Sequence, residues 1–245
     1  MATEKRVTLF VQCLVDGLYP EVGDAMIAIF NRLGISVDCP VEQTCCGQPA
    51  YNAGYRRAAC VAAKHFIEIF EDAEAIVCPS GSCVYMVKHH YPDLFEPHSN
   101  WFDRALRVGR KTFELTQYLV DELKVENLGA RYAGRITYHD SCHLLRGLKV
   151  AEQPRRLIRN IQDAELVEMR DADICCGFGG TFAVKYPDIS TAMVDDKISN
   201  ILATGADTVT GCDVSCLMNI QGRLHRIGSS VKTLHIAELL ARGLT

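Results

Sequence analysis

Eight of the 12 cysteines in this chain of 245 residues form a pattern that occurs twice. Each copy has a lone cysteine, a Cys-Cys-Gly turn and a further cysteine; these are Cys13, Cys45, Cys46 and Cys83 in the first copy and Cys142, Cys175, Cys176 and Cys216 in the second. The interval between equivalent cysteines stays nearly constant from the first position of the pattern to the last. A repeat that keeps its spacing over so long a stretch predicts two related halves, each presenting several thiols.

The composition narrows the choice of compartment and partner. Lys and Arg total 26 against 30 Asp and Glu, and no basic stripe with interleaved aromatic residues indicates a nucleic-acid partner. Gln12 and Asp16 interrupt the apolar run near the N-terminus, and no stretch approaches the roughly 18 apolar residues of a membrane span. We therefore expect a cytoplasmic protein that has no transmembrane segment and does not bind nucleic acid.

So many cysteines in a reducing compartment favour metal binding or redox chemistry over structural disulfides. A disulfide between adjacent residues such as Cys45 and Cys46 would form a strained ring. We therefore do not expect the cysteines of these pairs to form disulfides with each other. Cys39 and Cys60 lie outside the pattern, at the end of an apolar run and within a helical stretch. We expect both in the core.

Strand and helix patterns alternate along both halves. In the first half they predict strands over 6–13, 35–41 and 75–78 and helices over 21–33, 55–70 and 82–91; in the second half they predict strands over 135–139, 165–169 and 208–210 and helices over 154–161, 191–203 and 217–227. This order favours parallel βαβ units. The predicted fold is α/β, with two pseudo-symmetric halves, each a mainly parallel sheet flanked by helices. We assign 1–97 to the first domain, 98–133 to a connecting helical segment and 134–245 to the second domain.

The predicted order of elements gathers the cysteines. Open parallel sheets bind ligands at the edge where the carboxyl ends of their strands meet. Each lone cysteine follows a strand, each adjacent pair occupies the turn before a helix, and each last cysteine opens a helix. A helix N-terminus lowers a thiol pKa and so favours the thiolate that binds metals. We expect the cysteines of each copy to converge and the two resulting sites to face one another.

Zinc, an iron–sulfur cluster and a reversible dithiol are the chemistries that use thiolates in this way. Structural zinc usually takes two close cysteine pairs, which Cys-Cys-Gly turns with single outlying cysteines match poorly. A dithiol relay needs two cysteines and leaves most of the repeated set without a role. Iron–sulfur clusters use thiolates from separate loops and need small residues nearby, which Gly47, Gly81, Gly177, Gly179 and Gly180 supply.

The cysteine spacing and the surrounding sequence together resemble a known family. The motifs are VTLFVQCLVDGLYPEVG, EQTCCGQPAYNAGY, PSGSC, YHDSCH, CCGFGGTFAVKYP and CLMNIQGRL. Nearly from end to end, the chain is similar to the lactate utilization protein A family, whose members carry two cysteine-rich CCG domains. It more distantly resembles the CCG-containing subunit of heterodisulfide reductase and the iron–sulfur subunit of glycolate oxidase.

This resemblance implies one or two iron–sulfur clusters per chain, of the 4Fe–4S type, and electron transfer in the oxidation of L-lactate to pyruvate. It implies companion redox proteins of a lactate-oxidising complex as partners, so the chain would be an oxidoreductase subunit that is incomplete alone. The implied cluster and metal ligands are Cys13, Cys45, Cys46, Cys83, Cys142, Cys175, Cys176 and Cys216. The motifs assign no catalytic residue.

The terminal turns depart from the heterodisulfide reductase pattern, in which each copy ends with CxxC and five thiolates bind the cluster. Here the turns are CPSGSC and CDVSC, and Cys78 and Cys212 do not occupy equivalent positions of the repeat. Both are candidate additional ligands, with burial in the core as the alternative. His139 and His143 flank Cys142 and either donate to sulfur or are ordinary satisfied histidines.

Two other functions stay open on the sequence alone. One is a zinc-stabilised scaffold that organises partners without moving electrons. The other is a thiol–disulfide reductase of the heterodisulfide reductase type. Iron and acid-labile sulfide in the purified protein separate these alternatives from an iron–sulfur protein.

Overall fold

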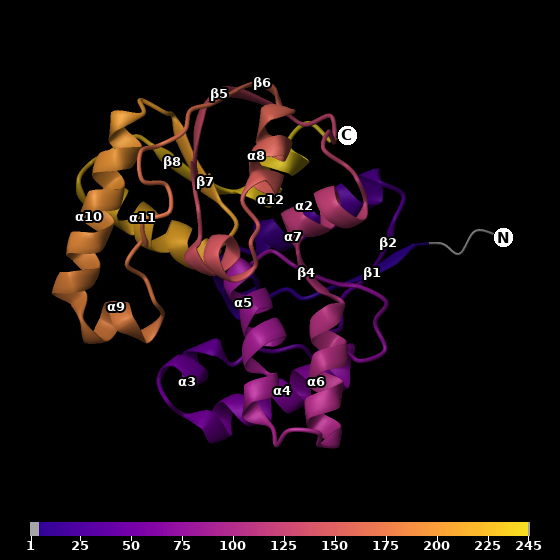
Figure 1. The fold of residues 1–245 in the computed structure, drawn as a ribbon. Coiled ribbons are helices and arrows are strands. Elements are labelled where there is room, and N and C mark those ends of the chain that lie inside the picture. The colour runs from indigo at the N-terminus through magenta and orange to yellow at the C-terminus, as the bar shows by residue number, and fades with distance from the viewer. Residues whose placement is uncertain (1–4, 245) are drawn as a thin grey trace.

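The computed structural model describes residues 5–244. Figure 1 shows two sheets that lie next to one another, with helices packed around both. Each sheet has four parallel strands, in the orders β2-β1-β3-β4 and β6-β5-β7-β8. The predicted α/β fold with two similar halves is confirmed.

Helices and strands alternate along both halves. The strands of the first half are β1 (Arg6–Leu9), β2 (Ser36–Asp38), β3 (Ile76–Cys78) and β4 (Thr112–Glu114), and its helices are α1 (Cys13–Leu18), α2 (Pro20–Arg32), α3 (Gln48–Asn52), α4 (Arg56–Phe70), α5 (Gly81–Tyr85), α6 (Asn100–Arg110) and α7 (Leu115–Gln117). The second half has β5 (Arg131–His139), β6 (Gln162–Leu166), β7 (Thr208–Gly211) and β8 (Lys232–His235) with α8 (Glu152–Arg159), α9 (Thr181–Lys185), α10 (Pro187–Ala203), α11 (Val214–Arg226) and α12 (Ile236–Ala241). Short π-helical or 3-10 turns occupy Met86–His90, Pro92–Leu94, Tyr118–Glu122 and His143–Gly147.

The long helices form where apolar residues recur at helical spacing. In α4 the buried residues are Ala59, Ala63, Phe66, Ile67 and Phe70, all on one face, because positions three and four apart lie above one another on a helix. The opposite face of α4 carries exposed Arg57 and Glu68. Packing of this face, rather than intrinsic helix propensity, is what stabilises such a helix.

Residues 98–133 join the halves and also complete the first sheet. Helix α6 packs against α4, where Arg104 makes a bidentate ion pair with Glu71 at 2.7–2.8 Å. Strand β4 then pairs with β3, Ile76 opposite Thr112. This strand is only three residues long, which is why no periodic pattern marks it in the sequence.

The two sheets correspond in register as well as in order. In the first, β1 pairs with β3 so that Leu9 lies opposite Val77. In the second, β5 pairs with β7 so that Tyr138 lies opposite Thr210. The interval along the chain from Leu9 to Tyr138 is the same as that from Cys13 to Cys142, so β5 is the equivalent of β1. Each residue beside one cysteine set has a definite counterpart beside the other.

A single apolar core joins the halves. It contains Leu9, Met26 and Phe30 from the first half together with Tyr138 and Leu239 from the second. Helix α12 lies against α2, as Figure 1 shows, and this is the most extensive contact between helices of the two halves. Burial of apolar surface on both sides of the junction makes the halves one packed unit rather than two independent domains.

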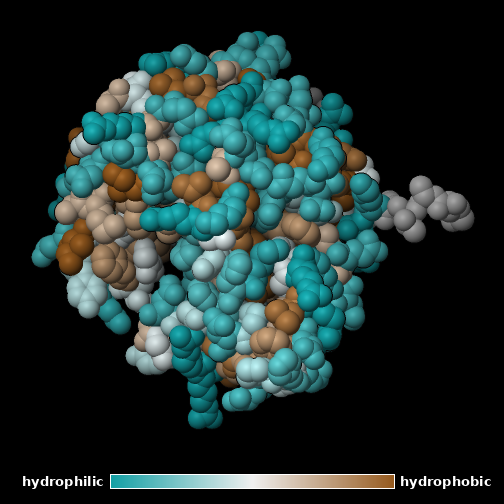
Figure 2. All heavy atoms as spheres, in the orientation of Figure 1, coloured by the Kyte–Doolittle hydropathy of each residue, from teal (hydrophilic) through white to brown (hydrophobic). Residues whose placement is uncertain are grey.

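The visible surface in Figure 2 is mainly hydrophilic, with small hydrophobic patches scattered over it. Isolated exposed apolar side chains of this kind are normal for a globular protein. Among residues 5–244, none of the helices combines the length and the apolar character needed to cross a membrane.

Equivalent buried side chains cap the helices that follow the last strand of each sheet. Glu114 accepts hydrogen bonds from the backbone N–H of Thr116 and Gln117 at the start of α7. His235 Nδ1 accepts the N–H of Ala237 at the start of α12 and so must be unprotonated there. Burial raises the pKa of Glu114 to about 7 and lowers the pKa of His235 to about 4. Both charged forms are disfavoured because water is excluded.

The low pKa of His235 predicts an acid-sensitive contribution to stability. Because the native pKa of about 4 lies below the ordinary value of 6.5, the stabilisation is fully present above pH 6.5 and is lost as pH falls toward 4. The difference corresponds to about 3 kcal/mol. We expect the stability gap between wild type and His235→Asn, which keeps a capping side chain, to narrow by this amount between pH 7 and pH 4.

Urea denaturation at several pH values measures that gap. Taking the difference between the two proteins cancels the opposite contribution of Glu114, whose raised pKa favours the native state as pH falls. The matched control is His225→Asn, on the exposed side of α11. A gap that stays constant for His235→Asn would show that this imidazole is not held neutral.

Candidate metal centre

The structure brings the four cysteines of the first set together. The Sγ atoms of Cys46 and Cys83 are 3.4 Å apart. Cys45 lies close enough to Cys13 and Cys46 for these thiols to shift one another's pKa. The four residues come from α1, the turn before α3 and the first turn of α5, all of which follow strands of the first sheet. Segments that are far apart in the sequence therefore present sulfur at one place.

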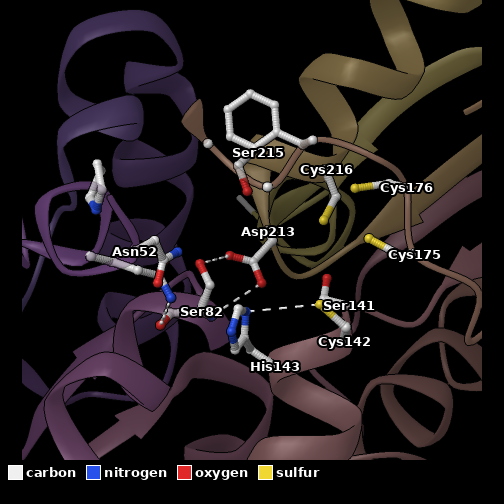
Figure 3. A pocket seen from close by; sticks show the side chains of 15 residues that line it. Asn52, Ser82, Ser141, Cys142, His143, Cys175, Cys176, Asp213, Ser215 and Cys216 are labelled. Carbon is white, nitrogen blue, oxygen red and sulfur yellow. Dashed lines mark hydrogen bonds between the residues drawn. The ribbon is translucent and has the colours of Figure 1, made fainter. Parts of the chain in front are cut away.

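The second set converges in the same way. Cys175 lies close enough to Cys142 and Cys176, and Cys176 to Cys216, for these thiols to shift one another's pKa. Figure 3 shows these four sulfur atoms around a common space between the Cys-Cys-Gly loop and the start of α11. The sequence thus predicted correctly which thiols meet, while their role as ligands remains a prediction.

Glycine in each Cys-Cys-Gly turn permits the geometry. Gly47 and Gly177 both have φ of 82°, a left-handed conformation that other residues rarely adopt. A side chain at Gly177 would place Cβ 2.6 Å from the carbonyl oxygen of Ser190. In this conformation each glycine N–H donates to the first cysteine of the pair, at 3.4 Å to Cys45 and to Cys175. The turn therefore aims both a thiol and a backbone donor at the site.

Mutual hydrogen bonding divides the thiols into proton donors and acceptors. Bonds from neighbouring thiols lower the pKa of Cys45 to about 3 and that of Cys175 to about 2. The same bonds raise the pKa of the donating thiols Cys13 and Cys142. Closely packed thiols cannot all ionise, because like charges repel in a site shielded from water. A bound cation removes this restriction and displaces the remaining protons.

The residues present fit a thiolate-bound metal centre. Two thiolates on one tetrahedral metal ion at about 2.3 Å are roughly 3.8 Å apart, close to the 3.4 Å between the sulfurs of Cys46 and Cys83. Backbone N–H donors and nearby glycines are also present, as iron–sulfur sites require.

The structure distinguishes the four cysteines outside the two sets. Cys78 is fully buried and shares a hydrogen bond with Cys83, so it adds a fifth sulfur to the first set. Cys212 is equally buried, but its Sγ lies 3.4 Å from the hydroxyl of Tyr138 and near the carboxyl group of Glu114. It is therefore not part of the second set. Cys39 is exposed, contrary to expectation, because β2 lies at the edge of its sheet; Cys60 is half-buried on α4.

The two sets lie on either side of a junction between equivalent segments. Ser80 and Asp213, the residues before α5 and α11, pair with each other across it as an antiparallel bridge. The buried carboxylate of Asp213 accepts hydrogen bonds from the hydroxyls of Ser80 at 2.5 Å and Ser82 at 2.9 Å. Figure 3 shows Ser82 and Asp213 joined in this way. A cavity of about 100 Å³ beside it is lined by second-set cysteines and by Asn52 and Ser82 of the first half.

Two buried cations organise the second site. Arg155 binds both oxygens of Asp140 at 2.9 and 2.7 Å and also binds Glu168, fixing the loop that leads to Cys142. Lys197 is fully buried on α10 and donates to the carbonyl oxygens of Asp171 and Ala172 at 3.0 Å, just before the Cys-Cys-Gly turn. No carboxylate within the described part of the chain forms an ion pair with Lys197. Its charge therefore favours negative charge on the second set.

Comparison with known proteins agrees with the repeated architecture. A family model for the cysteine-rich CCG domain matches residues 7–88 and again 136–221. These ranges contain the two cysteine sets and most of the strands that lead to them, whereas β4 and β8 lie outside. The fold and site thus define a protein with two copies of the cysteine-rich CCG domain.

Full-length relatives narrow the class. The chain is 50% identical to lactate utilization protein A of an Exiguobacterium species over 97% of this chain and 98% of the relative. It is 50% identical to the protein of that name from a Geobacillus species, covering 96% and 98%, and 45% identical to lactate utilization protein A 2 of Bacillus cereus, covering 98% and 99%. The chain belongs to the lactate utilization protein A family.

Solved structures add little. An aspartate racemase homologue from Pyrococcus horikoshii aligns over 98% of this chain and 97% of its own length. Its sequence identity is 15% and the TM-score is 0.35, too low to support an argument about the site.

Loss of the Arg155 clamp should destabilise the protein. Arg155→Met leaves Asp140, which is 5% exposed, as a buried charge without its partner. The expected cost is about 3 kcal/mol in the free energy of unfolding. Arg159→Met is the matched control, because the Arg159 side chain is 52% exposed and its ion pairs should contribute no more than about 0.5 kcal/mol. Urea unfolding curves of both variants measure the difference. Similar curves would show that the ion pair of Arg155 with Asp140 does not stabilise the protein.

Proposed function

We propose that this chain is the iron–sulfur electron-transfer subunit of a system that oxidises L-lactate to pyruvate, working in the cytoplasm with companion redox proteins. The observation that carries the proposal is the convergence of two thiol sets at equivalent edges of two parallel sheets. The relatives' name, lactate utilization protein A, supports a role in lactate oxidation.

Each set would hold one cluster, of the 4Fe–4S type. The ligands would be Cys13, Cys45, Cys46 and Cys83 in the first half and Cys142, Cys175, Cys176 and Cys216 in the second. A bound cluster supplies one-electron transfer, whereas oxidation of a 2-hydroxy acid to a 2-oxo acid releases two electrons and two protons. A chain with two such centres is suited to pass on an electron pair that a companion protein withdraws from the substrate.

The chain's own residues prepare the sites for this role. The thiols of Cys46, Cys83, Cys176 and Cys216 are buried, so water has little access to the sulfur. Burial from solvent and backbone donors to sulfur are among the features by which proteins set cluster potentials. The cavity between the halves opens the second set toward Asn52 and Ser82, which places a polar surface next to the proposed centre.

A zinc-stabilised scaffold is the second candidate. The ligand atoms of His139, Cys176 and Cys216 lie within 4.8 Å of one another, a grouping that also suits tetrahedral zinc. Zinc has no redox chemistry, so this candidate could organise partners but could not carry electrons. Metal and sulfide content distinguish the two.

Removing one ligand from each set should separate the sites. We expect Cys45→Ser and Cys176→Ser each to lose about half of the iron and acid-labile sulfide of anaerobically purified wild type, because each disables one of two clusters. Cys60→Ser, on α4 outside both sets, should keep all of it. Metal analysis, sulfide assay and electron paramagnetic resonance of dithionite-reduced protein provide the measurements.

Each other outcome has a definite meaning. Equal iron in all three variants would contradict the ligand assignment. A colourless protein that contains zinc and no sulfide would replace the electron-transfer proposal with the scaffold. Circular dichroism should accompany each variant, so that loss of metal is separated from loss of fold.

A further inference from the structure

His139 is buried in an unusual way. It is the last residue of β5 and is 1% exposed, and neither of its ring nitrogens makes a hydrogen bond of normal geometry within residues 5–244. The imidazole nevertheless lies near enough to Cys216 to lower the pKa of that thiol. Buried polar atoms are nearly always paired, and leaving one unpaired costs about 1–3 kcal/mol. A neutral imidazole has one donor and one acceptor nitrogen, so both functions are unused here.

The unpaired imidazole lies at the second cysteine set. One ring nitrogen of His139 and the Sγ atoms of Cys176 and Cys216 are all within 4.8 Å of one another. The hydroxyl of Ser141, two residues further on, is also buried without a geometrically satisfied partner among residues 5–244. Unpaired polar groups around a set of thiols indicate a ligand that pairs with them.

The strand register identifies the residue of the first half that is equivalent to His139. His139 lies opposite Gly211 in the pairing of β5 with β7. By the same register the first half has Phe10, whose N–H bonds Val77, next to Cys78 on β3. Phe10 packs against Phe66 and Phe70, and Cys78 contacts Cys83. The potential fifth donor is therefore a thiol on β3 in the first half and an imidazole on β5 in the second.

Gly211 is what gives the imidazole room. It has no side chain where Cys78 has one, and a Cβ added there would lie 3.9 Å from the Cβ of His139 and 3.3 Å from its carbonyl oxygen. A thiol at this position would compete with the imidazole for the same space. The two substitutions between the halves, phenylalanine to histidine and cysteine to glycine, therefore act together.

We propose that His139 is a nitrogen ligand of the metal centre held by the second cysteine set, so that the two centres of this chain differ in ligation. The inference rests on the proposed function, because it requires a metal centre at that set. A neutral imidazole as the fifth donor, where Cys78 offers a thiolate in the first half, leaves the second centre less negative and so raises its reduction potential. The buried cation Lys197 acts in the same direction, and its counterpart in the first half, counted from the start of α4 and α10, is Phe66. The second centre should thus be the better electron acceptor of the two.

Isotope labelling tests ligation without altering the chain. Wild-type protein is produced with ¹⁵N-histidine and with natural histidine, and the reduced cluster is studied by pulsed electron paramagnetic resonance. We expect a strong nitrogen coupling that changes with the label. The coupling should disappear in His139→Phe, which carries the first-half residue. It should persist in His143→Phe, whose ring lies tilted against Tyr85 with Nδ1 3.9 Å from the Sγ of Cys142.

A conservative variant tests the effect on potential. His139→Cys restores a fifth sulfur and should keep the iron content of wild type, but its second centre should lose the nitrogen coupling and titrate at a lower potential. If His139→Phe fails to fold, the labelled wild type decides whether a histidine binds, and His139→Cys together with His143→Phe decides which one: loss of the coupling in His143→Phe would overturn the assignment.

The outcomes separate this inference from the proposed function. Iron and sulfide present, with no histidine-dependent coupling in the wild type, would overturn the ligation of His139 and leave the electron-transfer proposal standing. Coupling that is lost in His143→Phe and kept in His139→Phe would also overturn it. Absence of iron and sulfide at the second set would overturn the proposed function and this inference together.

Discussion

Parallel strands end at the same edge of their sheet, and both candidate sites depend on that constraint. The loops after β1, β2 and β3 deliver Cys13, Cys45 with Cys46, and Cys83 to one place, although most of the first half of the chain separates the first from the last. The second sheet repeats the arrangement with the same pairing register. No single loop contains a complete site, so each site exists only when its sheet is assembled.

Thiolates packed this closely repel one another, and the two halves of the fold surround their cysteine sets with different residues. Neighbouring thiolates repel one another when water is excluded, and in the unligated arrangement they share protons instead. The first half surrounds its set with aromatic packing, including Phe10, Phe66 and Tyr91. The second half places Lys197 and the unpaired imidazole of His139 nearby. A gene duplication that began with equal halves would in this way yield two centres of unequal affinity for electrons.

Much of the architecture could be predicted from periodic patterns. The predicted strands and the long helices, such as α2, α4, α10 and α11, agree with the structure within a few residues, because each has the apolar pattern of its type. The sequence does not predict the short helices α1, α3 and α9, which contain or follow the cysteines, or the edge strands β4 and β8. Tertiary contacts rather than a local pattern decide the structure of such short segments. The role of His139 was left open between a sulfur donor and a satisfied histidine. Comparison of its position with that of Phe10 would have marked it as different, but nothing in the sequence shows that both ring nitrogens are unpaired.

The sequence by itself determined that the chain is duplicated, that each half is an alternating α/β unit, and which four cysteines of each half belong together. These properties follow from spacing, which is a one-dimensional quantity. Only the tertiary structure decided that Cys78 joins the first set while Cys212 turns toward Tyr138, and that an imidazole and a buried lysine accompany the second. The physical reason is that the direction of a side chain at a strand end depends on the neighbouring strand, and neighbouring strands are distant in sequence.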